Sequence, residues 1–301
     1  MLQLLLGGSG SGKTTLLYQR IRARAEKGEK SILLVPEQFT SSTEGRIYRE
    51  LGDALSGMVE SFSFTSLAEK ILSTEGGAAV QTLSDAGRAV LVRRALEELQ
   101  DNVHYYHRHR RSAAFCQMAA QTIDELKSAG LSGQQLAQLA GACGAESGKL
   151  SELALIFQGY ETLLARSGMD PSDRLELAGA RLEEALARHS LPEFLRDRAV
   201  FIDEFDTFNA PKKRLLAALL TALPQVTVAL CDDGTPLVPG DTGLFAGAKQ
   251  VAAQLRQLAR KSGTEVHAPE LLRRDLRHQD APGLAAVARL LEGEAVDPTP
   301  A

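Results

Sequence analysis

The chain has 301 residues, of which 44% are hydrophobic, and its formal net charge is −4. This is enough apolar material for one large hydrophobic core or for two smaller ones. The negative balance argues against a uniformly basic nucleic-acid binder, but it leaves room for a local basic groove.

The cysteines and the start of the chain indicate the cellular compartment of the protein. Cys116, Cys143 and Cys231 are scattered and form no C-x-x-C pair. We expect buried thiols in a reducing compartment rather than a disulfide framework or a zinc site. No apolar run is long enough to span a membrane, and Met1 leads directly into the first predicted strand, which leaves no room for a signal peptide. The sequence therefore predicts a cytoplasmic protein with no membrane partner.

The first predicted strand, residues 2–6, is followed directly by the sequence GGSGSGKT, which fits the phosphate-loop pattern G-x-x-x-x-G-K-[ST]. The glycines let successive backbone N–H groups point at phosphate oxygens, and the helix that follows adds the positive end of its dipole. Lys13 can reach the β and γ phosphates, and Thr14 can offer its hydroxyl to Mg²⁺. The alternative is a glycine-rich turn that matches by chance, and the strand in front of it counts against that alternative. We therefore predict that ATP and Mg²⁺ bind at Gly7, Gly8, Ser9, Gly10, Ser11, Gly12, Lys13, Thr14 and Thr15.

Further elements follow in chain order. The early α/β pattern predicts strands at 31–35 and 58–62 and helices at 13–27 and 44–55, with a short helix after the third strand. From about residue 82 to residue 189 the pattern is typical of helices only, at 85–100, 113–129, 132–142, 150–167 and 173–189. Ser84 and Ser132 fit as N-caps of two of these helices. The α/β pattern then returns with strands at 199–203 and 226–231 and helices at 211–223 and 247–261.

Strands separated by helices of this length indicate a parallel sheet with right-handed crossovers. Because the helical block lies between two α/β stretches, we expect it to be inserted into one nucleotide-binding core. The predicted core comprises residues 1–80 and 192–266, and the helical insertion comprises residues 81–191. After Glu265 the pattern weakens, so residues 267–301 are predicted to be a linker or the start of a further domain.

The strand at 199–203 ends in two carboxylates, Asp203 and Glu204. A phosphate loop needs an acidic residue on a neighbouring strand to hold Mg²⁺, and ligands gather at the carboxyl edge of a parallel sheet. We predict that Asp203 organises the metal and that Glu204 accepts a proton from the attacking water. An ordinary strand that ends in surface acids is the alternative. Asp232-Asp233 ends the next strand, where a solvated turn is favoured over a contact with the γ-phosphate. No arginine can be assigned to the transferring phosphoryl group, and no residue to stacking on the base.

Several segments resemble the first motor domain of superfamily 1 helicases: the phosphate loop, Leu34–Thr40, Ser61–Ala68 and Phe201–Asn209. Together with Ile123–Leu131 and Lys149–Leu153 they more closely resemble the AddB family, the B subunits of bacterial AddAB helicase–nucleases. The resemblance covers roughly residues 1–280. The phosphate loop is generic, whereas its combination with Leu34–Thr40 and Ile123–Leu131 is specific.

The resemblance implies an α/β fold, a parallel-sheet P-loop NTPase with an all-helical insertion subdomain. It also implies a role in processing DNA double-strand-break ends for homologous recombination, in a heterodimer with an A-type helicase–nuclease subunit. Members of this family carry a C-terminal nuclease domain with an iron–sulfur cluster. This chain is too short for that domain or for a second motor domain, and its three cysteines cannot form the cluster. We therefore expect an N-terminal portion with weak ATPase activity at most.

Two departures from a helicase matter. The segment Gly234–Leu237 lacks the glutamine that senses the γ-phosphate, and the helicase Thr-x-His segment has become Ser61-Phe62-Ser63. Asp203-Glu204 is nevertheless present, so weak hydrolysis stays open.

Two groups of residues are candidates for DNA contacts. If the resemblance holds, Gln38, Thr40 and Ser63 line a single-strand groove and bond phosphate oxygens. Helix capping is the alternative for Thr40 and Thr65, and it is favoured for Thr65.

The segment His104–Arg111 is the densest basic and aromatic cluster of the chain. Arg108, Arg110 and Arg111 are candidates for gripping DNA, and a solvated connection between two helices is the alternative. The histidine spacing, without nearby acids or cysteines, is weak evidence for a metal site.

A second function from a different class remains open: a stand-alone P-loop phosphotransferase, such as a small-molecule kinase, whose helical block is a substrate lid. His104–Arg111 is the only candidate for a lid arginine set. A third possibility is a nucleotide that stabilises the fold without turnover.

Overall fold

The computed structural model describes residues 1–79, 81–99 and 101–291. Gln100, the predicted end of one helix, and residues 292–301 of the predicted linker lie outside the described residues. The chain divides into two compact units. The sheet unit contains residues 1–67, 183–208 and the chain from 216 onward, and the helical unit contains residues 68–182 and 209–215.

The sheet unit is built on six parallel strands in the order β3-β2-β4-β5-β1-β6. They are β1 (Leu2–Gly7), β2 (Ser31–Leu34), β3 (Val59–Phe62), β4 (Ala199–Ile202), β5 (Gln225–Cys231) and β6 (Glu270–Leu272). The α/β class and the parallel sheet predicted from the alternating pattern are confirmed. One detail was wrong: β5 lies between β1 and β4, so the acidic strand is not the neighbour of the strand that precedes the phosphate loop.

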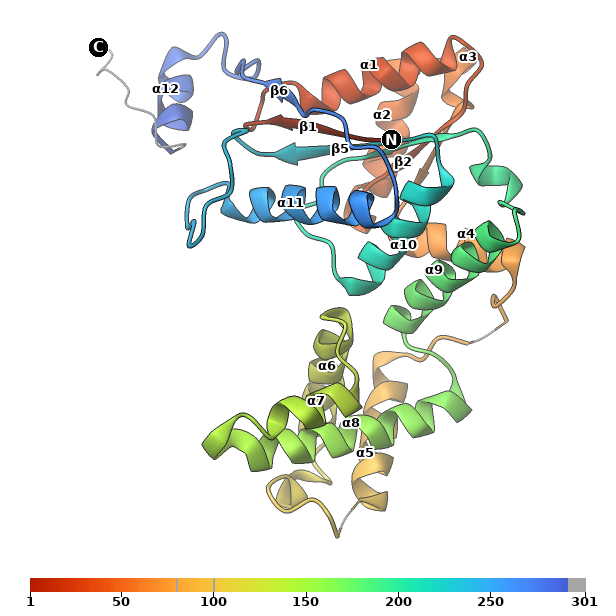
Figure 1. Cartoon of the computed structure of the whole chain (residues 1–301), viewed down its shortest axis with the longest axis vertical. Helices are drawn as coiled ribbons and strands as arrows, with labels where there is room; N and C mark the ends of the chain where they lie inside the picture. The colour runs from red at the N-terminus through yellow and green to blue at the C-terminus, as the bar shows by residue number, and fades with distance from the viewer. Residues whose placement is uncertain (80, 100, 292–301) are drawn as a thin grey trace. The chain divides into compact units, whose positions relative to one another are not determined.

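Helices cover the two faces of this sheet. They include α1 (Lys13–Ala25), α2 (Thr40–Leu51), α3 (Asp53–Ser56), α10 (Ala210–Ala222) and α11 (Ala246–Lys261), with short 3₁₀ turns η1 (Glu37–Phe39) and η4 (Glu193–Leu195). A last helix, α12 (Pro282–Leu291), follows β6 and buries none of its residues. Figure 1 shows α1 and α11 on opposite faces. Because strand side chains alternate between faces, Leu5, Leu33 and Phe201 pack with Leu17 and Ile21 of α1 in one core cluster.

The helical unit has a core of its own. Its elements are α4 (Phe64–Glu75), α5 (Asp85–Glu98), η2 (His107–His109), α6 (Ala113–Ser128), α7 (Gly133–Ala140), η3 (Gly144–Glu146), α8 (Ser147–Ser167) and α9 (Pro171–Ala187), with the ends of α4, α9 and α10 shared between the units. Leu96, Ile123, Leu136, Phe157 and Tyr160 are among the buried residues of its core cluster. The helices predicted here are all found, with ends shifted by a few residues.

Local chemistry sets the helix boundaries. The hydroxyls of Ser84 and Ser132 accept the N–H groups of Gly87 and Gln135, so both predicted N-caps are confirmed. The helix predicted at 44–55 is divided at Gly52, whose φ of 75° no helix interior allows.

Two other predictions need correction or comment. Cys116 is buried as expected, but Cys143 and Cys231 are exposed, and none of the three forms a disulfide. Among the described residues, none of the helices combines the length and apolar character needed to cross a membrane.

Candidate nucleotide-binding site

The loop from Gly7 to Thr14 connects β1 to α1 at the carboxyl edge of the sheet. Gly10 and Gly12 have φ angles of 80° and 89°, in the left-handed region that favours glycine. A Cβ on Gly12 would also lie 2.7 Å from Cδ1 of Leu276. These glycines allow the tight curl by which the chain leaves the strand and enters the helix.

Lys13, the first residue of α1, turns back over this loop. Its Nζ donates hydrogen bonds to the carbonyl oxygens of Gly7, at 2.8 Å, and Gly8, at 2.7 Å. Burial lowers the pKa of its ammonium group, while the nearby Asp203 and Glu204 carboxylates act in the opposite direction. Lys13 is thus a partly desolvated cation held at the mouth of the loop.

Asp203 and Glu204 follow β4 at the same edge. Asp203 is only 6% exposed, and burial raises the pKa of its carboxyl, although a hydrogen bond with the Thr14 hydroxyl favours the ionised form. The Asp203 Oδ1 also accepts the backbone N–H of Glu204 at 3.0 Å. Glu204 is exposed and has a φ of 65°, a strained conformation for a residue with a side chain. The strand end therefore places one carboxylate against Thr14 and turns the next toward solvent.

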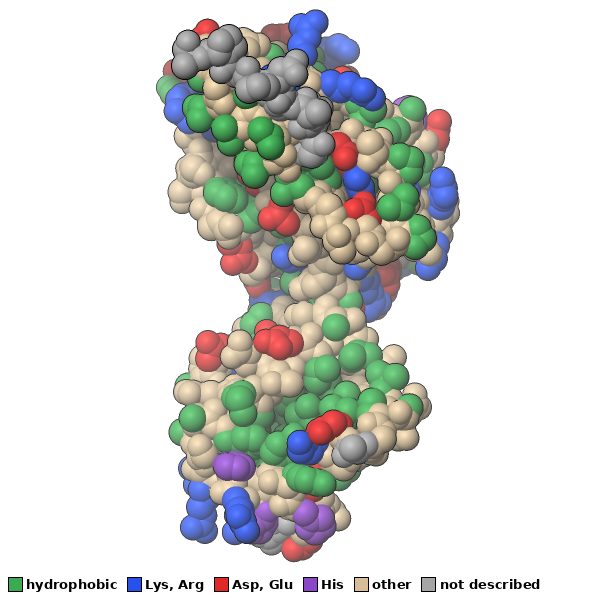
Figure 2. All heavy atoms as spheres, turned by 90° about the vertical axis from the view of Figure 1, so that its left-hand side faces the viewer, with side chains coloured by type: hydrophobic (Ala, Val, Ile, Leu, Met, Phe, Trp, Pro, Cys, Tyr) green, Lys and Arg blue, Asp and Glu red, His purple; other side chains and the backbone are tan. Residues whose placement is uncertain are grey.

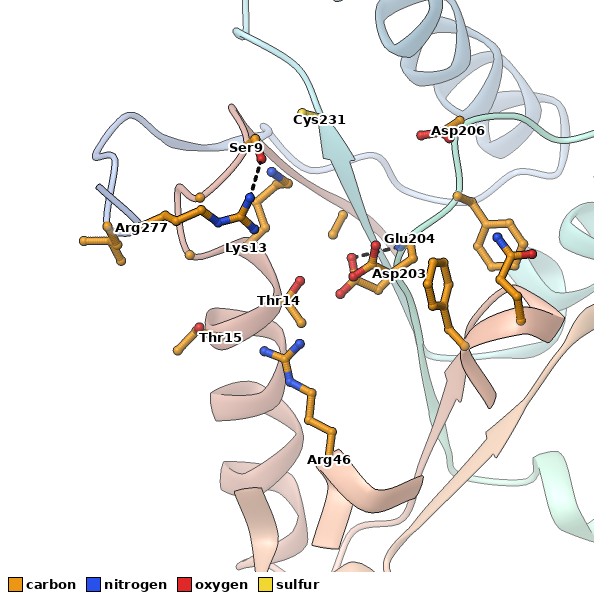
Figure 3. A pocket seen from close by; sticks show the side chains of 17 residues that line it. Ser9, Lys13, Thr14, Thr15, Arg46, Asp203, Glu204, Asp206, Cys231 and Arg277 are labelled. Carbon is orange, nitrogen blue, oxygen red and sulfur yellow. Dashed lines mark hydrogen bonds between the residues drawn. The ribbon is translucent and has the colours of Figure 1, made fainter. Parts of the chain in front are cut away.

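A cavity of about 630 Å³ lies between the loop and the end of β4. Ser9, Gly10, Gly12, Lys13, Thr14 and Thr15 line one side, and Asp203 and Glu204 line another (Figure 3). Gly7, Gly8 and Ser11, which the motif also assigned to the nucleotide, instead line a separate cavity of about 270 Å³ together with Ser9, Asp232 and Asp233. Of the predicted nucleotide, metal and catalytic residues, six of the loop and both carboxylates therefore meet at one cavity.

Two arginines that the sequence did not single out line the same cavity. Arg46 comes from α2, and its guanidinium lies 4.9 Å from the ring centroid of Tyr18 on α1. Burial raises the pKa of Tyr18 to about 12, so its ring stays neutral beneath that cation. In Figure 3 the Arg46 side chain points toward Thr14.

Arg277 reaches the cavity from the other side. Its Nη1 donates to the Ser9 hydroxyl at 3.1 Å, and the preceding Leu276 N–H donates to the Gly10 carbonyl at 2.9 Å. This contact depends on β6, which the sequence pattern did not predict and which pairs in parallel with β1. No local signal marks Arg46 or Arg277, because each is placed by the packing of a distant element.

Asp232 and Asp233 do not line the larger cavity. Asp232 is buried and accepts the N–H of Gly234 at 2.7 Å, and Asp233 forms an ion pair with Lys249 at 3.2 Å. The favoured solvated turn is thus wrong for Asp232, whose carboxylate is enclosed by its own turn.

The residues predicted to line a DNA groove have the following places in the structure, and their contact with DNA stays a prediction. Gln38 lines the larger cavity. Thr40 begins α2 and its hydroxyl donates to the Glu37 carbonyl, so it is not the N-cap considered for it. Ser63 is buried and accepts the N–H of Ser66 at 3.1 Å, which makes Ser63, rather than the favoured Thr65, the residue that caps α4.

The donor set at this cavity suits Mg²⁺. A threonine hydroxyl and a carboxylate are hard oxygen ligands, and a magnesium ion bound to a nucleotide takes most of its other ligands from phosphate and water. Among residues 1–79, 81–99 and 101–291, no group of three or more His, Cys, Asp or Glu side chains is arranged to hold a metal by itself. The site fits a metal that arrives with a phosphate group.

Comparison with known proteins identifies the family. The family model described as "ADDB, N-terminal" matches residues 4–288. The chain belongs to the AddB family. Proteins named as the B subunit of an ATP-dependent helicase/deoxyribonuclease are similar to it: that of Desulforudis audaxviator is 34% identical over 96% of this chain, and that of Moorella thermoacetica is 33% identical over 94%. The one from Symbiobacterium thermophilum is 32% identical over 96%.

This AddB-family chain spans about a quarter of the length of these relatives, 25% of the first two and 26% of the third. The resemblance found in the sequence motifs is therefore confirmed, and the match falls on the family's N-terminal part.

Proposed function

We propose that this AddB-family chain is the ATP-binding, helicase-like portion of an AddB protein. In this proposal the sheet unit is a P-loop NTPase core and the segment between β3 and β4 is its helical insertion, near residues 81–191. One observation carries the proposal most directly: Lys13, Thr14, Asp203 and Glu204 line a single cavity at the carboxyl edge of a parallel sheet.

Each of these residues has a role in binding Mg²⁺–ATP. The loop N–H groups and the α1 dipole favour the phosphates. Lys13 exchanges its present acceptors, the Gly7 and Gly8 carbonyls, for phosphate oxygens. Thr14 and Asp203 hold Mg²⁺, which when bound neutralises charge on the β and γ phosphates. Arg46 and Arg277 add positive charge to the cavity, and Glu204 orients water for weak hydrolysis.

The names of the relatives support a proposal for the activity of the whole protein. We propose that the chain works with an A-type helicase–nuclease subunit on DNA double-strand-break ends, as part of an ATP-dependent helicase/exonuclease for homologous recombination. The three dispersed cysteines of this chain are too few to hold the iron–sulfur cluster of the family. The alternative phosphotransferase function gains no support from the family match, which covers residues 4–288.

Titration of the chain with Mg²⁺–ATP, followed by calorimetry, tests the proposal. Lys13→Ala is expected to weaken ATP binding by about 100-fold, because it removes a charge-assisted contact worth about 3 kcal/mol. Lys27→Ala removes an exposed lysine just past the end of the same helix and is expected to change nothing. Equal ATP affinities for the native chain and Lys13→Ala would remove the proposed site.

A second titration separates a DNA-coupled role from a purely structural nucleotide. Single-stranded DNA is expected to change the ATP affinity or the slow ATPase rate of the native chain. No effect on either quantity would count against coupling to DNA.

A further inference from the structure

Residues 104–111, which we call the 104–111 turn, connect α5 to α6 in the helical unit. The turn contains three arginines, three histidines and two tyrosines, and no Asp or Glu occurs from residue 102 to residue 123. In a chain with a net charge of −4 this is a pronounced local excess of basic groups. Figure 2 shows side chains of the Lys and Arg class (blue) and of His (purple) gathered at one end of this unit.

A buried carboxylate from a distant helix holds the backbone of this turn. Glu152 of α8 is 6% exposed, and its two oxygens accept the backbone N–H groups of His104, at 2.7 Å, Tyr105, at 2.9 and 3.0 Å, and Tyr106, at 3.2 Å. Burying a carboxylate costs free energy unless hydrogen bonds compensate it, and here three donors do so. The turn is therefore fixed at its first three residues by an internal anion.

Apolar packing fixes the turn further. Val103 is buried in the core of the helical unit, and the Tyr106 ring stacks on Phe115 of α6 at 5.2 Å. The Tyr105 ring lies so close to α8 that a Cβ on Gly148 would be 2.8 Å from it. Yet Tyr105 is 56% exposed, so one face of its ring remains open to solvent.

The arginines on this fixed backbone lack acidic partners among the residues that the structure describes. No carboxylate of residues 1–79, 81–99 or 101–291 lies within ion-pairing distance of Arg108, Arg110 or Arg111, and the Arg110 guanidinium contacts the His107 ring at 3.3 Å. On α5, just before the turn, Arg93 and Arg94 pair with Glu97 and Glu98 at 3.1 Å. Within the described part of the chain, the turn thus presents uncompensated cations, whereas the neighbouring helix neutralises its own.

We propose that the 104–111 turn is a DNA-backbone contact, in which Arg108, Arg110 and Arg111 bind phosphates and Tyr105 offers a ring to an adjacent base. The inference rests on the proposed function, which supplies DNA as the polyanion. Because Glu152 orders the backbone before DNA arrives, binding costs little additional ordering entropy. Contacts of arginines to phosphates are independent of base sequence, so the turn positions DNA without reading it.

The salt dependence of DNA affinity tests this contact. In the native chain, log Kd rises with log salt concentration by roughly 0.9 for each duplex phosphate neutralised, or roughly 0.7 on a single strand. The triple variant Arg108→Ala/Arg110→Ala/Arg111→Ala is expected to lose a slope of about 2 to 3 and to bind about 10- to 100-fold more weakly at low salt. Because Arg108 and Arg111 are exposed and Arg110 is only half-buried, the variant is expected to keep its fold, which circular dichroism checks.

A control variant that removes the same number of positive charges elsewhere shows whether the change in slope comes from the turn or from net charge alone. Arg93→Ala/Arg94→Ala/Arg166→Ala also removes three positive charges, two of them paired on α5 and one at the far end of α8, about 20 Å along the helix from Glu152. This control is expected to keep the native slope. An unchanged slope in the turn variant, or equal losses in both variants, overturns the proposal.

Further measurements identify which form of DNA the turn binds, and they test the DNA contact separately from the proposed ATP site. Tyr105→Leu is expected to weaken single-stranded binding more than duplex binding, because only unpaired bases offer a free face. An equal effect on both forms overturns the stacking role.

A native chain that binds ATP through Lys13 but binds no DNA overturns the contact and leaves the ATP site intact. A turn variant that loses ATP affinity as well shows a general defect and also overturns it.

Discussion

The phosphate loop and the 104–111 turn are both short connections rich in backbone N–H groups, but they use those groups in opposite ways. In the loop, the left-handed glycines Gly10 and Gly12 shape the backbone around a cavity, and the neighbouring cation, Lys13, is held by carbonyls of the loop itself. In the 104–111 turn, three N–H groups are already satisfied by the Glu152 carboxylate. In our two proposals, the loop offers its backbone N–H groups to an incoming phosphate, whereas the turn, whose N–H groups already bind Glu152, offers its side chains to DNA.

The largest expected effect is that a variant of each region loses one binding affinity and keeps the other. Lys13→Ala should lower ATP affinity about 100-fold and leave nucleotide-free DNA affinity unchanged. The triple arginine variant of the turn should do the reverse. Calorimetry for ATP and fluorescence anisotropy for labelled DNA, on the same preparations, measure both. Loss of both affinities in the turn variant would show a general defect, and loss of both in Lys13→Ala would show that DNA binding also depends on the phosphate loop.

The next effect concerns the internal anion. Glu152→Ala leaves the buried N–H groups of the turn without an acceptor, so we expect the free energy of unfolding to fall by about 3 kcal/mol. Glu152→Gln keeps a carbonyl acceptor and should lose less. Glu98→Ala, on the exposed face of α5, is the control and should change stability by less than about 0.5 kcal/mol. Denaturant unfolding measures all three, and a loss in Glu152→Ala no larger than in the control contradicts the anchoring role.

A smaller effect concerns stability at the nucleotide site. Since burial raises the pKa of Asp203, the folded state binds its proton more tightly than the unfolded state does, and ionised Asp203 destabilises the fold. Asp203→Asn should therefore stabilise the nucleotide-free chain at pH 7, which denaturant unfolding measures. Because the pKa of Asp203 is raised in the folded state, the stability of the native chain falls between the ordinary aspartate pKa and the raised one. The advantage of Asp203→Asn should grow as pH rises above the ordinary aspartate value of 3.8 and then level off above the raised pKa. An advantage that is constant between pH 3.5 and 7 would exclude this origin.

The smallest expected effect is the difference in stability between two variants that replace a helical glycine with alanine. A Cβ on Gly45 of α2 meets nothing within 4 Å, so Gly45→Ala should raise the free energy of unfolding by about 0.5 to 1 kcal/mol. A Cβ on Gly148 would lie 2.8 Å from the Tyr105 ring, so Gly148→Ala should show no such gain and should disturb the turn. Thermal unfolding of the two variants distinguishes them, and equal gains would mean that Tyr105 does not rest on α8.

The same contrast explains what the sequence could predict. The phosphate loop is a contiguous motif, and buried strands and helices follow from the local apolar pattern, so the sheet and most helices were predictable. The end of β4 was predictable because Asp203 follows a fully apolar run. The place of β5 between β1 and β4 was not, because strand order is decided by the packing of whole βαβ units.

Residues placed by distant contacts escaped the sequence pattern. Arg277 reaches Ser9 only because β6, a strand of three residues, pairs with β1. Glu152 is one carboxylate on a long helix, and its partners lie 46 to 48 residues away. The serines and threonines at 40, 63 and 65 were ambiguous because one residue type serves caps and phosphate contacts alike, and only the position of the helix start decides between them.

The magnesium dependence of ATP binding tests the central claim most directly, because it asks whether the phosphate loop and Asp203 hold one ligand. The account predicts that Mg²⁺ strengthens ATP binding by the native chain and has a much smaller effect on Asp203→Asn, while Asp203→Asn binds metal-free ATP at least as tightly as the native chain because it lacks the negative charge of the carboxylate. If Mg²⁺ strengthens ATP binding to the same extent in both, Asp203 does not hold the metal and the proposed site is contradicted.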